Sequence, residues 1–190
     1  CIRDRDVESQ KSTLPERKAT RLNGYDYSQN GCYFVTVCIN DKRPLLGAYR
    51  SKQEIQTAAL RDRPQDAVQL TPLGLEVEKS IRFMSRQNAS VSVQNAVIMP
   101  NHIHLLIVLH SDTNAPAGAG KNPTLQQVIG NLKSYTTKRY RDIGGKTDSA
   151  LWQRSFYDRI IRNQAEFENA WNYITYNAFK EYGKREENPW

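Results

Sequence analysis

The segment that most constrains the fold is residues 91–109, where two runs of mainly aliphatic residues meet at the motif MPNH. Residues 91–99 and 103–109 are short and rich in valine, isoleucine and leucine, which predicts two β-strands. We expect the two strands to lie in one antiparallel sheet. A sheet must cover an apolar face with other elements, so the rest of the chain has to supply that cover.

Helical patterns precede and follow these strands. Thr71 followed by Pro72 is typical of a helix start, and apolar residues then recur at helical spacing to about residue 87. Thr124 and Gln127 resemble a capping box at the start of a second helix. A last helix is predicted over residues 164–182. Its predicted apolar stripe consists of Phe167, Trp171, Ile174 and Ala178.

Further strands are predicted at residues 32–39 (CYFVTVCI), at residues 157–161 and, poorly defined, within residues 45–56. The order strand, helix, strand, strand, helix, strand, helix predicts an α+β domain. Its most natural packing is a ferredoxin-like antiparallel sheet covered by helices. We expect this domain to span residues 23–183, after a flexible basic arm at residues 1–22 and before a tail at residues 184–190.

The formal net charge of +7 favours a polyanionic partner, nucleic acid before a membrane surface. No run of about 20 apolar residues is present, so we expect no membrane partner. The three cysteines are not in metal-pair spacing and fit a reducing compartment, which predicts a cytoplasmic protein.

His102 is the last residue of the MPNH motif, and His104 follows two residues later. Residues two apart on a strand face the same side, so both imidazoles project together while Ile103 and Leu105 enter the opposite face. Paired imidazoles on a rigid strand suit a divalent metal ion. Two surface histidines on a half-exposed strand would give the same pattern.

The predicted last helix carries Tyr173 and Asn177, which are four apart and therefore stack on one helical face. A tyrosine hydroxyl can act as a nucleophile where its surroundings favour the phenolate, and an amide oxygen can be a hard metal ligand. The simpler interpretation is an aromatic packing residue followed by a surface amide.

Five segments together resemble the REP-associated tyrosine transposases of the HUH family. The clearest is VIMPNHIHLLI at residues 97–107. The other four are NGYDYSQNGCYFVTVC (23–38), NLKSYTT (131–137), LWQRSFYDRIIRN (151–163) and NAWNYITYN (169–177). They occur in the family's order and cover most of residues 17–180.

The resemblance implies an HUH endonuclease-type fold and transesterification of DNA through a 5′-phosphotyrosine. His102 and His104 match the metal-binding histidines, Tyr173 matches the nucleophile, and Asn177 matches the residue that completes the metal site. The implied metal is Mg²⁺ or Mn²⁺, and the implied partner is single-stranded or hairpin DNA of the repetitive extragenic palindrome (REP) type. Ala178 stands where relatives have a proline, which should lengthen the helix.

Basic and aromatic side chains are candidates for contacts to phosphates and unpaired bases. These candidates are Arg17, Lys18, Arg21, Tyr25, Tyr27, Lys133, Lys138 and Arg139. Tyr135, which lies among three of them, is the main rival nucleophile to Tyr173, and Tyr157 and Tyr176 are further ones.

Two other functions fit the sequence. One is a non-catalytic hairpin-binding protein that retains the HUH fold. The other is a zinc hydrolase built on His102 and His104, which would need a third histidine or carboxylate ligand. We expect a monomer, because the two histidines and Tyr173 can meet within one chain, with a dimer that shares its sites as the alternative.

Overall fold

The computed structural model describes residues 27, 29–51, 54, 67–110, 123–146 and 149–187, with side chains up to residue 181. The predicted arm at residues 1–22 lies outside the described residues. The last helix extends to Glu187, so the predicted tail is helical over residues 184–187. No helix in the described part is both long and apolar enough to cross a membrane.

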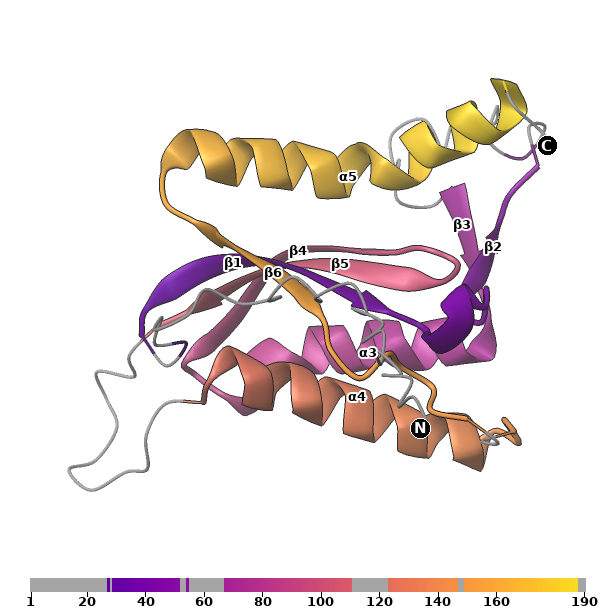
Figure 1. Cartoon of the computed structure of the whole chain (residues 1–190), viewed down its shortest axis with the longest axis horizontal. Coiled ribbons are helices and arrows are strands. Elements are labelled where there is room, and N and C mark those ends of the chain that lie inside the picture. The colour runs from indigo at the N-terminus through magenta and orange to yellow at the C-terminus, as the bar shows by residue number, and fades with distance from the viewer. Residues whose placement is uncertain are drawn as a thin grey trace, which may run out of the picture.

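The main sheet has four antiparallel strands in the order β4-β5-β1-β6 (Figure 1). These strands are β1 (Gly31–Cys38), β4 (Val91–Ile98), β5 (His102–Leu109) and β6 (Tyr157–Ile161). In chain order, the two central strands are the first and third of the four. This is the order of the split β-α-β-β-α-β arrangement, so the predicted ferredoxin-like α+β fold is confirmed.

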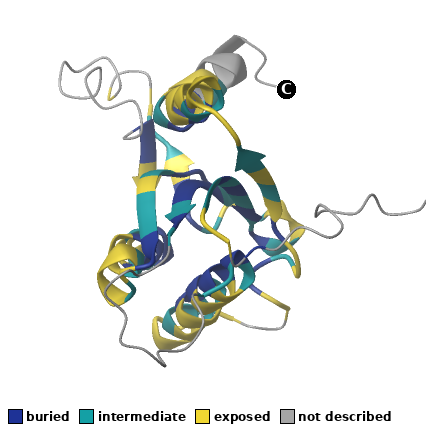
Figure 2. Ribbon diagram, turned by 90° about the vertical axis from the view of Figure 1, so that its left-hand side faces the viewer, coloured by how far each residue is buried: buried dark blue, intermediate teal, exposed yellow. Residues whose placement is uncertain are grey.

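In the described part of the chain, three helices cover the two faces of this sheet (Figure 1). Helices α3 (Pro72–Gln87) and α4 (Leu125–Asp142) lie together on one face, and α5 (Gln164–Glu187) lies on the other. Buried residues accordingly form two clusters, one on each face of the sheet. Figure 2 shows the buried side of α3 and α4 turned toward the sheet and their exposed side turned outward.

The predicted helix starts are confirmed in their capping contacts. Thr71 Oγ1 accepts a hydrogen bond of 3.1 Å from Gly74 N, directly before Pro72 at the first helical position. Thr124 and Gln127 form the predicted capping box at the start of α4. These contacts satisfy amide groups that the first turn of a helix leaves without partners.

A bulge in β4 changes which of its residues face α5. Val91 and Val93 pack on the α3 and α4 side, and the register with β5 then shifts between Val93 and Asn95. After the shift, Asn95 faces α5, where its amide donates hydrogen bonds to Thr175 Oγ1 (2.9 Å) and Trp171 O (3.2 Å). The bulge therefore supplies a polar anchor that fixes the last helix on the sheet.

Two sequence predictions were wrong in detail. Among the described residues of the expected strand at 45–56, a shorter strand, β2 (Gly47–Tyr49), forms, and it pairs with an unpredicted strand, β3 (Val68–Leu70), in a separate sheet. Trp171 is 40% exposed rather than part of the core. Ala170, 8% exposed, takes the inward position, and Trp171 is turned about 100° around the helix to stack on Phe167.

Candidate active site

His102 and His104 lie on β5 with their rings converging on the face covered by α5. Their Nε2 atoms are 3.1 Å apart, and their rings meet edge to face at 4.7 Å between centroids. Ile103 and Leu105 between and after them are fully buried in the cluster on the opposite face. The predicted division of this strand between two faces is therefore confirmed.

Each imidazole is held from behind by a hydrogen bond at Nδ1. His102 Nδ1 lies 2.7 Å from Asn101 Oδ1, and His104 Nδ1 lies 2.8 Å from Thr36 Oγ1. Because an amide oxygen only accepts, His102 Nδ1 is the donor and its Nε2 keeps a lone pair. The threonine hydroxyl can accept in the same way, so both Nε2 atoms can present lone pairs to one ion.

Burial keeps both imidazoles neutral near pH 7. Burial, with a smaller contribution from the neighbouring His102, lowers the pKa of His104 to about 3. Burial also lowers the pKa of His102, and the nearby Glu181 carboxylate opposes that shift. Neutral imidazoles can bind a metal ion without first losing a proton.

The histidine pair fits a divalent ion. Two nitrogen ligands at adjacent corners of an octahedron, each about 2.1 Å from the ion, lie about 3 Å from each other, which matches the 3.1 Å separation of the Nε2 atoms. In the described part of the chain, no third histidine, cysteine or carboxylate joins this pair in a cluster that could hold a metal ion.

Helix α5 brings Tyr173 to the same place. Its ring lies edge-on to His104, at 5.3 Å between centroids, and edge-on to Phe34, at 5.6 Å. Tyr173 is 45% exposed, so a substrate can reach it from solvent. Asn177, one turn further on, is buried at 3% exposure. The structure therefore brings His102, His104 and Tyr173 together, with Asn177 one turn along the same helix.

Besides Asn101, which holds His102, three other residues of this site were not predicted from the sequence. Phe34 stacks on His104 at 5.2 Å and 27°, and Thr36 holds the same histidine. Both lie on β1, whose pairing with β5 no local pattern reveals. Glu181 acts electrostatically on His102. It could have been predicted from its spacing, because it lies four residues after Asn177 and eight after Tyr173 and therefore on the same helical face.

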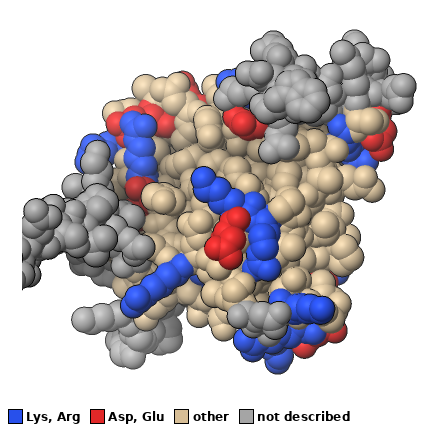
Figure 3. Space-filling model, turned by 45° about the vertical axis from the view of Figure 1, so that its right-hand side comes forward, with Lys and Arg blue, Asp and Glu red and all other residues tan. Residues whose placement is uncertain are grey.

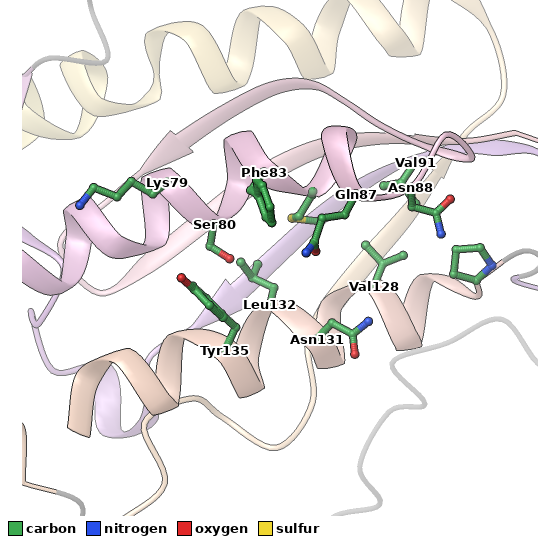
Figure 4. A pocket seen from close by; sticks show the side chains of 12 residues that line it. Lys79, Ser80, Phe83, Gln87, Asn88, Val91, Val128, Asn131, Leu132 and Tyr135 are labelled. Carbon is green, nitrogen blue, oxygen red and sulfur yellow. The ribbon is translucent and has the colours of Figure 1, made fainter. Parts of the chain in front are cut away.

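Tyr135, the main rival nucleophile, lies on α4 and therefore on the other side of the sheet from the histidines. It lines a groove between α3 and α4 together with Phe83 and Leu132 (Figure 4). The groove lies between α3 and α4, and Figure 1 shows these two helices on the opposite side of the sheet from α5. Tyr135 therefore does not share a site with the histidine pair.

The predicted nucleic-acid contacts on α4 are also on that far side. Lys133 donates to Gln153 O (2.9 Å) and Ser155 O (2.8 Å), so its ammonium group fastens the loop before β6. Arg139 pairs with Glu76 and Asp142, whereas Lys138 is exposed. On the face shown in Figure 3, basic side chains form separate groups, several of them next to acidic ones.

The predicted base-stacking role of Tyr27 does not agree with its position. Tyr27 is 7% exposed and stacks on the buried Tyr33 at 5.9 Å between ring centroids, so its ring belongs to the core. Other predicted contacts lie outside the described residues. These are Arg17, Lys18, Arg21 and Tyr25.

The buried imidazole of His104 predicts a pH-dependent stability. Its folded pKa is depressed below 6.5, so its contribution to the free energy of unfolding is complete above pH 6.5 and is lost as the pH falls toward 3. In EDTA, between pH 7.5 and 5, this loss should be about 2 kcal/mol. Urea denaturation at both values measures it. His104→Asn should lose less over the same interval, and equal losses in the two proteins would contradict the account.

Residues 68–177, more than half of the chain, match the family model described as "Transposase IS200 like". An uncharacterised Haemophilus influenzae protein is 25% identical over 176 residues, which cover 86% of this chain and 89% of the relative. A second protein of that organism, named "Putative REP-associated tyrosine transposase", is 30% identical over 86 residues, 44% of this chain and 47% of its own.

Two solved structures are also similar. One is titled as the structure of a REP-associated tyrosine transposase bound to a REP hairpin, with a TM-score of 0.49 and 18% identity over 83% of this chain and 72% of that one. The other is a Deinococcus radiodurans protein described as a "putative transposase", with a TM-score of 0.40 and 11% identity over 78% of this chain and 91% of that one. The matched family model spans α3, both histidines, Tyr173 and Asn177, and on this evidence the chain belongs to the IS200-like transposase family.

Proposed function

We propose that this transposase is a metal-dependent endonuclease and strand transferase that acts on single-stranded DNA at REP-type hairpins. The observation that carries the proposal is the position of Tyr173, whose ring contacts the ring of His104 beside the converging Nε2 atoms. A tyrosine next to a metal-binding histidine pair suits attack on a phosphodiester. The similarity to a REP-associated relative supports the choice of substrate.

In the proposed reaction, the Tyr173 oxygen attacks the scissile phosphorus. A bond forms between that oxygen and phosphorus, and the bond from phosphorus to the 3′ oxygen breaks. The phenol loses its proton, and the departing strand takes one up to end in a 3′-hydroxyl. The number of phosphoester bonds is unchanged, so attack by another 3′-hydroxyl can rejoin the strands without ATP.

His102, His104 and Asn177 are proposed to hold Mg²⁺ or Mn²⁺. When bound, such an ion polarises the scissile phosphate and offsets charge that develops in the transition state. Asn101 and Thr36 orient the two imidazoles, Asn95 fixes α5 on the sheet, and Phe34 supports the rings of both His104 and Tyr173.

The test is a denaturing gel of the protein incubated with an end-labelled hairpin oligonucleotide and Mn²⁺. The proposal predicts a DNA strand covalently attached to the protein. Binding without cleavage would instead support the non-catalytic hairpin-binding protein.

The hydrogen bond behind His104 should tune metal affinity. Thr36→Val keeps the side-chain shape and removes the hydroxyl that orients His104 Nδ1. Mn²⁺ binding measured by calorimetry should weaken roughly 10- to 100-fold. Thr137→Val is the matched control, because the Thr137 hydroxyl donates to Lys133 O within α4, on the far side of the sheet. Equal affinity in all three proteins would show that Thr36 does not position the ligand.

The basic arm should contribute phosphate contacts, because Arg17, Lys18 and Arg21 lie within residues 1–22. We expect the affinity for hairpin DNA to fall steeply with salt. Each phosphate contact releases bound counterions and adds about 0.7 to 0.9 to the slope of log Kd against log salt. Deleting residues 1–22 removes three candidate contacts and should therefore reduce this slope by about 2 to 3. Fluorescence anisotropy at several salt concentrations measures the slope for the full chain and for the deletion variant. Equal slopes would show that residues 1–22 make no phosphate contacts.

A further inference from the structure

A cavity of about 340 Å³ lies beside Tyr173, between β1, β6 and the first half of α5. Phe34, Ile161 and Ala170 give it apolar walls, and Tyr173 itself lines one side. Phe34 and Tyr173 also contact His104, so the cavity adjoins the histidine pair across these two rings. Whatever occupies it lies next to the group proposed to attack DNA.

Polar groups complete the lining of this cavity. Asn169 is exposed, and within the described residues its side chain makes no hydrogen bond. Arg159 is also exposed, and its Nη2 lies 3.6 Å from Glu166 Oε1. The other carboxylate oxygen, Glu166 Oε2, accepts a hydrogen bond from Arg162 N. Both oxygens of Glu166 therefore face donors, and the lining offers an amide and a guanidinium group to a ligand.

From this arrangement we propose that the cavity binds one unpaired nucleobase, that of a nucleotide adjacent to the scissile phosphate. The inference rests on the proposed function of Tyr173. An aromatic ring and aliphatic walls suit the face of a base, which stacks on aromatic side chains in single-stranded DNA complexes. The size is at the small end for ligand pockets, which suits a single base better than a longer segment.

The two polar residues then take different roles. The Asn169 amide can donate to and accept from a base edge, so it distinguishes one base from another. The Arg159 guanidinium suits the phosphate of the same nucleotide, which carries no sequence information. Arg159 also offsets the charge of Glu166, so its loss would expose the phosphate to repulsion.

The experiment uses the full chain, Mn²⁺ and a library of hairpin oligonucleotides with randomised single-stranded flanks. Sequencing the protein-linked strands and the released 3′ ends gives the base composition on both sides of the cleaved phosphate. At one of the two adjacent positions, one base should be at least about fivefold more frequent than each of the other three bases. Asn169→Ala should abolish that enrichment, and Asn172→Ala, an exposed asparagine of α5 outside the cavity, should retain it.

The arginine gives the second arm of the test. Arg159→Ala should lower adduct yield by a similar factor for every base, whereas Arg154→Ala, an exposed arginine outside the cavity, should not. Adducts without base enrichment at either adjacent position would overturn the inference. Enrichment that survives Asn169→Ala would do the same.

A binding measurement separates this inference from the proposed function. The base analogue 2-aminopurine is moved through the flank of a hairpin oligonucleotide, in EDTA so that cleavage does not contribute. Fluorescence should be quenched at one position, and Phe34→Leu should reduce that quenching by at least half because the stacking ring is gone. Localised quenching without any adduct would refute the proposed chemistry and retain the base site. Adducts without localised quenching would refute the base site alone.

Discussion

Tyr173→Phe should abolish both DNA cleavage and the covalent adduct, a loss on the order of 10⁴-fold or more. The substitution removes only the hydroxyl that attacks the phosphate. The ring remains, and with it the edge contacts to His104 and Phe34. Because Tyr173 is 45% exposed, the free energy of unfolding should change by less than about 0.5 kcal/mol. Hairpin affinity should persist.

Tyr135→Phe is the matched control for this prediction. Tyr135 is similarly exposed, at 50%, but lies across the sheet from the histidines. It should retain cleavage and adduct formation at the level of the unmodified protein. Full cleavage by Tyr173→Phe, measured on labelled hairpin DNA, would exclude Tyr173 as the nucleophile.

Replacing both histidines should remove Mn²⁺ binding and reduce cleavage by on the order of 10³-fold or more. The two Nε2 atoms are the converging ligands of the proposed site, and no neutral aliphatic side chain can replace them. Calorimetry of His102→Ala combined with His104→Ala measures the binding, and the gel assay measures cleavage. Mn²⁺ affinity that survives the double substitution would place the metal elsewhere.

A second variant guards against unfolding in this experiment. His104 is only 5% exposed, so alanine leaves a cavity that costs stability. His102→Leu combined with His104→Leu fills more of that space and, like alanine, offers no atom that can bind a metal ion. Circular dichroism should show an intact fold for this variant, together with the same loss of Mn²⁺ binding.

Local sequence patterns predicted the helices that begin with recognisable capping residues. Thr71 and Pro72 fixed the start of α3, and the capping box of Thr124 fixed the start of α4. The spacing of His102 and His104 predicted a shared face because strand geometry alone decides it. The resemblance to HUH transposases added Tyr173, which the structure places against His104.

Contacts between distant strands could not be predicted in this way. Thr36 lies opposite His104 only because β1 pairs with β5, and that register depends on the whole sheet. The bulge in β4 changes which residues face α5, and no residue type marks it in the sequence. Lys133 appeared basic and available, yet its ammonium group binds two backbone carbonyl groups of a loop about 20 residues away.

The most direct test of the central claim is identification of the amino acid that becomes attached to DNA. The protein is incubated with a hairpin oligonucleotide and Mn²⁺, the adduct is trapped and digested, and mass spectrometry locates the modified peptide. The account predicts a single DNA-linked peptide that contains Tyr173. A linked peptide containing Tyr135, Tyr157 or Tyr176 instead, or cleaved DNA with no linked peptide, would contradict it.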